Sequence, residues 1–164
     1  MSIPTIASGS NEVIKRSELT KTIFDLLKST VLLGRGVAPP EGGWPNGTPG
    51  SGAFVPYTVL KTGAATTPGP SQPERLGRYR TSWMVAYAVT FHGKNESSVD
   101  EYADTVRDQI LALPREVSLD GVDWTVQQVQ IARMGATERD DSTSPAHWRL
   151  TDDVSLHLSR VRTT

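Results

Sequence analysis

Cysteine is absent from the 164 residues of the chain, and this absence removes several kinds of chemistry. Without thiols there is no thiolate nucleophile, no cysteine-based zinc site and no disulfide. Long apolar runs are also missing: no segment approaches the roughly 18 apolar residues of a membrane-spanning helix, and residues 1–21 lack the apolar core of a signal peptide. We therefore expect a soluble protein made in the cytoplasm.

An excess of charge of either sign is missing as well. The chain has 17 Lys and Arg residues against 18 Asp and Glu residues, a formal net charge of −1. Proteins that bind nucleic acid or anionic membranes as their main partner normally have a basic balance. The composition therefore argues against both partners, and the length suits one domain.

Glycine and proline are concentrated in two segments, residues 34–52 and 63–78. Their density there is too high for regular structure, so we predict two long loops. Loops longer than about 12 residues in a compact domain usually have a function. Before them lies a polar arm, residues 1–16, and we expect a single domain over residues 17–164.

Two amphipathic helices are predicted. In residues 17–28 the apolar side chains recur at helical spacing, with Ser17 as the expected N-cap. In residues 97–113 they recur again, with Ser97 or Ser98 as the expected cap and Pro114 ending the helix.

The remaining apolar segments favour strands. We predict strands at residues 53–62, with Pro56 favouring an edge position or a start just after it, and at residues 78–93 and 147–162. Residues 115–134 are typical of a hairpin that turns at Asp120-Gly121, with a bulge near Gln127 and Gln128. The expected fold class is α+β, a mainly antiparallel sheet packed with two helices.

The strand at residues 78–93 has an unusual second face. Its larger apolar side chains alternate, as expected for a strand with one face in a core, but Met84, Ala86 and Ala88 lie between them instead of charges. We therefore expect both faces of this strand to be covered by other parts of the protein or by a partner, and a second copy of the chain is one candidate partner.

A search for catalytic or metal-binding residues finds little. His147, Asp152, Asp153 and His157 are near one another in sequence, but their spacing matches no known metal motif, so we interpret them as a solvated face. No serine lies in a nucleophile elbow, and the glycine-rich segments lack a P-loop lysine. We expect no catalytic residue, no metal site and no cofactor.

Candidate contact residues are easier to find. Arg75, Arg78 and Arg80 gather near Tyr79, and we interpret them as a patch that is either solvated or paired with a partner. The mixed-charge residues Glu138, Arg139, Asp140 and Asp141 are candidates for register-setting interface contacts. Trp44, flanked by Gly and Pro, is a candidate interface anchor, whereas Trp148 is expected in the core.

The order of these motifs resembles the tail terminator, or tail completion, proteins of long-tailed bacteriophages. The resemblance spans residues 17–162 and rests on "IFDLLKS", "PYTVLKTG", "WMVAYAVTFHG" and "SVDEYADTVRDQILAL" in that order. It implies a virion protein of the tail and neck, a ring of six subunits that caps the tail tube and ends its polymerisation. The implied partners are the tail tube protein and the head-tail connector protein, with no enzymatic activity.

In such a ring, DNA passes through the channel as cargo. The acidic face of the second helix, Asp100, Glu101, Asp104 and Asp108, is a candidate channel lining, because negative charge lets DNA pass without sticking. A solvated helix face is the alternative interpretation of the same four residues.

Three other functions remain open. A head-tail connector or neck adaptor protein also forms rings and uses long loops. A small hydrolase or metal enzyme would need His147, Asp152, Asp153 and His157 to converge. A nucleic-acid-binding module would act through "RLGRYR", residues 75–80.

Overall fold

The computed structural model describes residues 13–44, 53–67, 72–75, 78–143 and 145–163. The elements along the chain are α2 (Arg16–Leu27), β1 (Leu33–Arg35), β2 (Tyr57–Thr66), β3 (Gln72–Arg75), β4 (Arg78–Gly93), α3 (Glu96–Leu111), β5 (Glu116–Leu119), β6 (Val122–Arg133), β7 (Glu138–Asp140) and β8 (His147–Thr163). No helix among these residues is long and apolar enough to cross a membrane.

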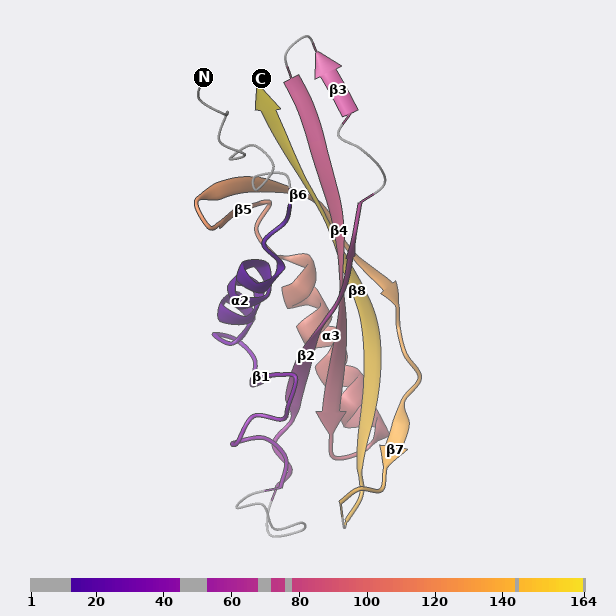
Figure 1. The fold of residues 1–164 in the computed structure, drawn as a ribbon. Coiled ribbons are helices and arrows are strands. Elements are labelled where there is room, and N and C mark those ends of the chain that lie inside the picture. Colours follow the sequence, from indigo (N-terminus) through magenta and orange to yellow (C-terminus); the bar gives the residue numbers. More distant parts are fainter. Residues whose placement is uncertain (1–12, 45–52, 68–71, 76–77, 144, 164) are drawn as a thin grey trace.

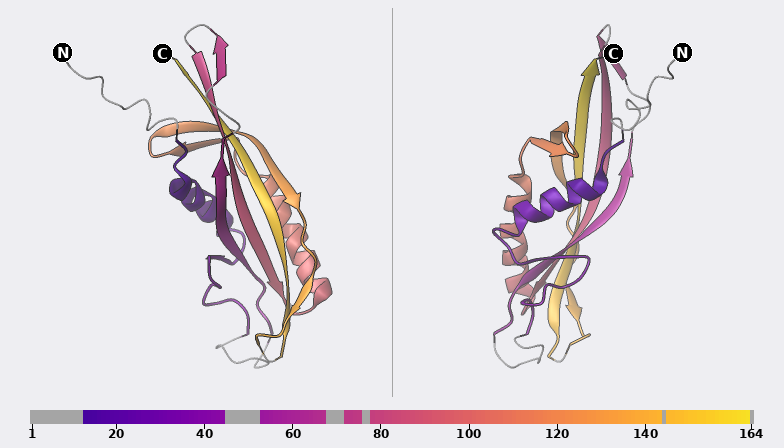
Figure 2. Two further views of the ribbon diagram at one scale, coloured as in Figure 1. Left: turned by 45° about the vertical axis from the view of Figure 1, so that its right-hand side comes forward. Right: turned by 60° about the vertical axis from the view of Figure 1, so that its left-hand side comes forward.

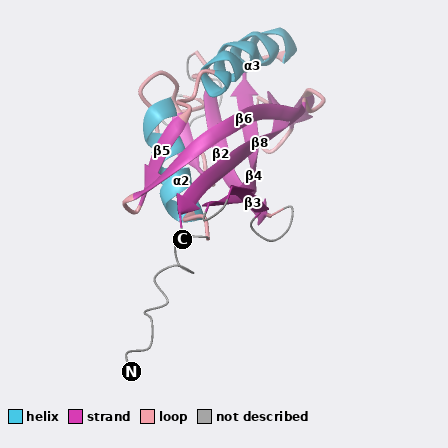
Figure 3. Ribbon diagram, turned by 90° about the horizontal axis from the view of Figure 1, so that it is seen from above, coloured by secondary structure: helices cyan, strands magenta, loops and turns pink. Residues whose placement is uncertain are grey.

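The strands form one curled sheet (Figures 1 and 2). The order across it is β1-β2-β4-β8-β6-β5, with β3 paired to β4 and β7 paired to β8. All pairs are antiparallel except β1 with β2. Seen from above, the sheet curls from β2 through β4 and β8 to β6 and β5, beside both helices (Figure 3). The predicted α+β class, with a mainly antiparallel sheet and two helices, is confirmed.

β4 and β8 form the spine of the sheet. Each of the 16 residues of β4 has a register partner on β8, from Arg78 opposite Thr163 to Gly93 opposite Trp148. Side chains alternate along a strand, so an unbroken ladder decides which residues face each side of the sheet. The strands predicted at residues 78–93 and 147–162 are confirmed.

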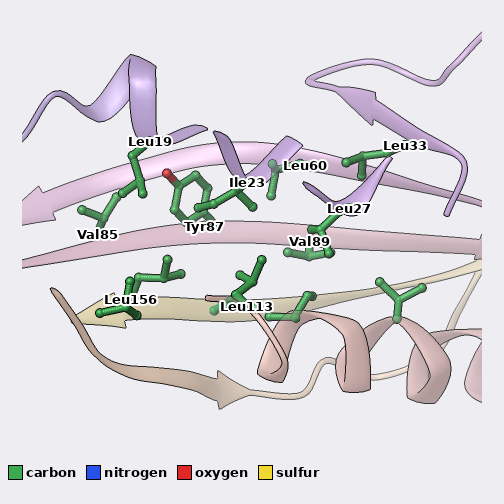
Figure 4. Packing of buried hydrophobic residues seen from close by; sticks show 14 of the residues in the cluster. Leu19, Ile23, Leu27, Leu33, Leu60, Val85, Tyr87, Val89, Leu113 and Leu156 are labelled. Atoms are coloured by element: carbon green, nitrogen blue, oxygen red, sulfur yellow. The ribbon is translucent and has the colours of Figure 1, made fainter. Parts of the chain in front are cut away.

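Both helices pack against the same face of this spine. Val85, Tyr87 and Val89 of β4 are at most 2% exposed and lie against Leu19, Ile23 and Leu27 of α2 (Figure 4). The buried face of α3 consists of Val99, Ala103, Val106 and Ile110. Each fully buried side chain of this size contributes about 1.5–3 kcal/mol, so this interface is the main source of stability.

The two predicted helices are confirmed, but neither predicted N-cap is. α2 begins at Arg16, one residue before Ser17, and its N-cap residue Lys15 makes no side-chain capping bond. α3 is capped by Asn95: the Ser98 N–H donates to Asn95 Oδ1 at 2.8 Å, and the Asn95 N–H donates to Ser98 Oγ at 3.1 Å. This reciprocal pair satisfies two backbone donors that a helix start leaves free.

The loop predicted at residues 63–78 is wrong at 63–66 and 72–75, which are strands. β2 begins directly after Pro56, as one of the two expectations had it, and continues to Thr66. A bulge between Thr62 and Ala65 keeps β2 paired with β4. Gly63 is required there, because a Cβ at this position would lie 2.8 Å from the Ala86 carbonyl oxygen.

The other predicted loop, residues 34–52, begins later than expected. Gly34 and Arg35 belong to β1, which pairs in parallel with β2, and residues 45–52 lie outside the described residues. Residues 36–42 are irregular, as predicted. An isolated bridge joins Gly43 to Val55 and closes this segment against the start of β2.

The predicted hairpin and its bulge are confirmed. Asp120 and Gly121 connect β5 to β6 with φ values of 53° and 77°. These positive values suit the two-residue turn whose twist matches that of the flanking strands. The pairing of β6 with β8 shifts register between Val126 and Gln128, where the sequence pattern changes phase.

One charged residue occupies a core position of β8. Asp152 is 0% exposed, and Arg107 of α3 holds its carboxylate with two hydrogen bonds of 2.6 and 2.9 Å. The Gly135 N–H donates a third bond, at 3.2 Å. This ion pair fastens α3 to the sheet, because two N–H groups of the Arg107 guanidinium each donate to a different oxygen of the Asp152 carboxylate.

Replacing Asp152 by Ala should lower the free energy of unfolding by about 3 kcal/mol, since Arg107 then loses its buried partner. Urea unfolding followed by circular dichroism measures this change. Asp153→Ala is the matched control, because the neighbouring Asp153 is exposed and should shift stability by less than about 0.5 kcal/mol. Equal losses in both variants would contradict the role given to the Arg107 pair.

Candidate functional site

The face of the β4–β8 spine opposite the helices is here called the open face. It is formed by Ser82, Met84, Ala86, Ala88 and Thr90 of β4 and by their partners on β8, Thr151, Asp153, Ser155 and His157 with Ser159. Met84 is 43% exposed, and Asp153 is the one Asp, Glu, Lys or Arg among these ten residues. The side chains are mostly small and uncharged, and most of them are polar, so a partner that covered this face would have to supply hydrogen bonds.

The second face of strand 78–93 is therefore not covered by the helices of the described chain. α2 and α3 both lie on the other side, and Ala86 and Ala88 are half-buried. Lys61 of β2, opposite Ala88, supplies an exposed charge at the margin. One face of an antiparallel sheet is commonly left to solvent, and the low charge of this one also suits cover by another protein.

A three-stranded arm extends beyond the helices, formed by β3 and the adjoining ends of β4 and β8 (Figures 1 and 2). The predicted residues Arg75, Arg78 and Arg80 all lie on it. Arg75 and Arg78 are register partners. β8 adds Arg160 opposite Thr81 and Arg162 opposite Tyr79. Sequence reasoning missed this addition, since the two arginines of β8 lie about eighty residues away along the chain and only strand pairing brings them here.

The remaining predicted contact residues are distributed over the molecule. Arg139 pairs with Asp141 at 2.8 Å, and both are exposed. Glu138 lies 3.8 Å from Arg149. Trp44 is partly buried: its ring meets Phe54 edge to face, and its Nε1–H donates to the Pro145 carbonyl at 3.3 Å.

The four candidate channel-lining residues of α3, Asp100, Glu101, Asp104 and Asp108, are exposed, as either interpretation of them requires. Asp104 pairs with Arg107 at 2.9 Å, and Asp100 accepts a hydrogen bond from Thr137. Glu101 and Asp108 are the two that are neither hydrogen-bonded nor ion-paired through their carboxylates in the described part of the structure.

The four residues of the hydrolase hypothesis do not converge. Asp152 faces the helices, whereas Asp153 and His157 belong to the open face. His147 begins β8, ten positions before His157. The interpretation of these residues as a solvated face is also wrong for His147 and Asp152, because both are buried. Trp148, expected in the core, is half-buried and packs against the core.

A different polar group forms at the end of the sheet, and sequence reasoning did not find it. It is here called the histidine cluster and consists of His92, His147 and Asp140, from the ends of β4, β8 and β7. His92 Nδ1 lies 3.0 Å from His147 Nε2, which lies 3.3 Å from Asp140 Oδ2. Strand pairing positions all three, since Asp140 is the register partner of His147.

Aromatic rings enclose the histidine cluster. Tyr57 stacks on His92 with ring centres 4.3 Å apart, and Phe54 stacks on His147 at 5.3 Å. His92 and His147 are 9% and 3% exposed. Burial disfavours the charged imidazole and lowers the pKa of both histidines; for His92, with a further contribution from His147, the pKa falls to about 4.

Asp140 is ionised beside these neutral rings. Burial opposes its ionisation, but hydrogen bonds from Ser142, together with interactions with His147 and Arg149, hold the pKa of the carboxyl below its usual value. The Arg149 guanidinium, 3.8 Å from Asp140 Oδ2, also favours the carboxylate. The histidine cluster thus offers two imidazoles and a carboxylate, which is a donor set that transition-metal ions bind.

The histidine cluster predicts a pH-dependent stability in protein freed of metal by a chelator. The pKa of His92 is lower in the folded chain than in the unfolded chain, so between about pH 6.5 and 4 the unfolded chain binds the proton that folded His92 refuses. The free energy of unfolding should therefore fall as the pH falls through this range. Three neighbouring groups also affect the pKa of His92: His147 and Arg149 lower it, and Asp140 raises it.

Urea unfolding at several pH values measures this slope. His92→Gln should reduce it by up to about 1.4 kcal/mol per pH unit. His157→Gln is the control: it should leave the contribution of His92 to this slope unchanged, because His157 is far along β8 from the histidine cluster. Identical slopes for wild type and His92→Gln would contradict the burial argument.

No protein-family model matches this chain, and no curated protein matches its sequence. Function is therefore inferred from the chain's own residues and their arrangement.

Proposed function

We propose that this protein is a tail terminator of a long-tailed bacteriophage, a structural subunit that forms a ring, of six copies by the family resemblance, on the end of the tail tube. The observation that carries the proposal is the open face. An antiparallel sheet face of small, mostly uncharged side chains that no helix of the described chain covers is suited to burial against another subunit.

The arginine-bearing arm supports the same function. A two- or three-stranded extension gains little stability in water by itself, so a projecting arm favours packing against a partner. Five arginines lie at register positions of both faces of the arm and would attract acidic surfaces of the next subunit, the tube or the connector. Such charge pairs set register and partner choice more than affinity.

Termination follows from a difference between the two sides of the ring. A tube grows because each added ring presents a surface that accepts the next one. A ring that matches the tube end on one side and the head-tail connector on the other stops the addition. A neck adaptor protein would instead bind the connector without recognising a tube end.

Replacing Ala88 by Arg should disrupt the ring, because it places a charge in the middle of the open face. We expect the concentration for half-assembly to rise at least about tenfold, since the long side chain overfills a face of small side chains at a cost of more than about 1.4 kcal/mol, even though Asp153 opposite can pair with its charge. Light scattering and electron microscopy measure assembly, with and without tail tube protein. Ala112→Arg, at the exposed C-cap of α3, is the matched control.

The outcomes distinguish the candidate functions. Rings of the wild type that bind tube ends support the terminator, and rings that bind only connector protein indicate the adaptor. A chain that stays monomeric with both partners would contradict both. Ala88→Arg assembling as well as Ala112→Arg would remove the open face from the interface.

The channel hypothesis has its own test. Glu101 and Asp108 are the suitable positions, since neither carboxylate is engaged within the described structure. Replacing both by Lys should slow DNA ejection or retain DNA in the tail if these residues line the channel, because the new positive charges bind phosphate. Unchanged ejection in an assay with purified virions would identify the acidic face as a solvated one.

A further inference from the structure

We propose that the histidine cluster is a binding site for a divalent transition-metal ion, Zn²⁺ in the first place, held by His92 Nδ1, His147 Nε2 and the Asp140 carboxylate. This inference is independent of the proposed function, because it concerns the opposite end of β4 and β8 from the arm and requires no partner chain.

The spacing of the three ligand atoms fits such an ion. Tetrahedral zinc with ligands at about 2.0–2.1 Å separates neighbouring ligand atoms by about 3.4 Å. His147 Nε2 lies 3.0 Å from His92 Nδ1 and 3.3 Å from Asp140 Oδ2, and all three atoms lie within 4.8 Å of one another. The two distances from His147 Nε2 are within a few tenths of an ångström of this value, and a bound ion would set the third distance, between His92 and Asp140.

The distribution of hydrogen-bond donors around His147 also favours a bound cation. The Thr143 hydroxyl donates its single proton to the Pro145 carbonyl at 2.9 Å, so it accepts one from His147 Nδ1 at 3.0 Å. In the neutral ring, His147 Nε2 then carries a lone pair that faces the Asp140 carboxylate. One N–H from His92 satisfies this lone pair but not the carboxylate, whereas a metal ion satisfies all three atoms.

Supporting contacts orient the ligands. Metal-binding histidines usually donate their second N–H to an oxygen, and His147 does so to Thr143. The Asp140 carboxylate accepts the Ser142 N–H at 2.9 Å through its other oxygen. Stacking on Tyr57 and Phe54 limits rotation of both imidazole rings. The site is thus already formed in the folded chain.

The donor set indicates which ion binds. Two nitrogens and one oxygen favour zinc and its neighbours in the transition series, whereas calcium and magnesium prefer oxygen alone. Water completes the fourth position. His147 lines a hollow with Trp44 and Phe54, and His92 lines another with Tyr57 and Arg149, so the ligands are reachable. Arg149 is the opposing charge, 3.8 Å from Asp140, but its side chain is 47% exposed, so water screens its charge.

Binding would join three strands at one end of the sheet. The ligands come from the ends of β4, β7 and β8, so the ion would tie the β7–β8 turn to the spine. Because the ion binds the folded chain and not the unfolded one, it should raise the unfolding temperature.

The test uses the full chain without a histidine tag, stripped of metal by a chelator. Titration calorimetry with Zn²⁺, and visible absorption with Co²⁺ as a zinc substitute, should show one ion per chain with micromolar or tighter affinity. Asp140→Asn and His92→Gln should each weaken binding at least about tenfold. Circular dichroism confirms that each variant is folded, and if one is not, the other decides.

Two further variants sharpen the result. His157→Gln removes the remaining histidine and should leave the affinity unchanged. Arg149→Gln should tighten zinc binding severalfold, because it removes the opposing charge. Failure of the folded wild type to bind Zn²⁺, or wild-type affinity in both Asp140→Asn and His92→Gln, would overturn the proposal.

Discussion

The structure depends on the unbroken pairing of β4 with β8. Each residue of β4 has its partner on β8, and this register decides which side chains face the helices and which face outward. The large apolar residues meet α2 and α3, and the small neutral ones form the open face. At one end the same ladder continues into the arm, and at the other it places His92 and His147 within reach of each other.

Two buried polar groups show how this framework accommodates charge. Asp152 interrupts the apolar phase of β8 and is stable there because Arg107 and Gly135 satisfy its carboxylate. The histidine cluster instead contains two neutral imidazole rings and an ionised carboxylate. Its nitrogen and oxygen lone pairs face one another, and there are too few N–H protons to form a hydrogen bond at each contact. The first group fastens α3 to the sheet, and the second is organised for a ligand.

The proposed terminator and the proposed metal site concern different parts of the chain. Assembly would use the open face and the arginine-bearing arm. The metal would act within one subunit, at the turn between β7 and β8. Because a ring needs rigid subunits to keep its symmetry, a tie between three strand ends is compatible with that function.

The sequence alone determined the elements with strong periodicity: both helices, the spine strands, the Asp120-Gly121 hairpin and its bulge follow from local spacing and turn chemistry. Tertiary structure decided the rest. Gly63 to Thr66 form a strand because β4 offers them an edge to pair with, which outweighs the local glycine and proline signal. His92 and His147 lie 55 residues apart, and Arg162 reaches the arm only through β8. Such contacts depend on strand register, a long-range property that no local pattern contains.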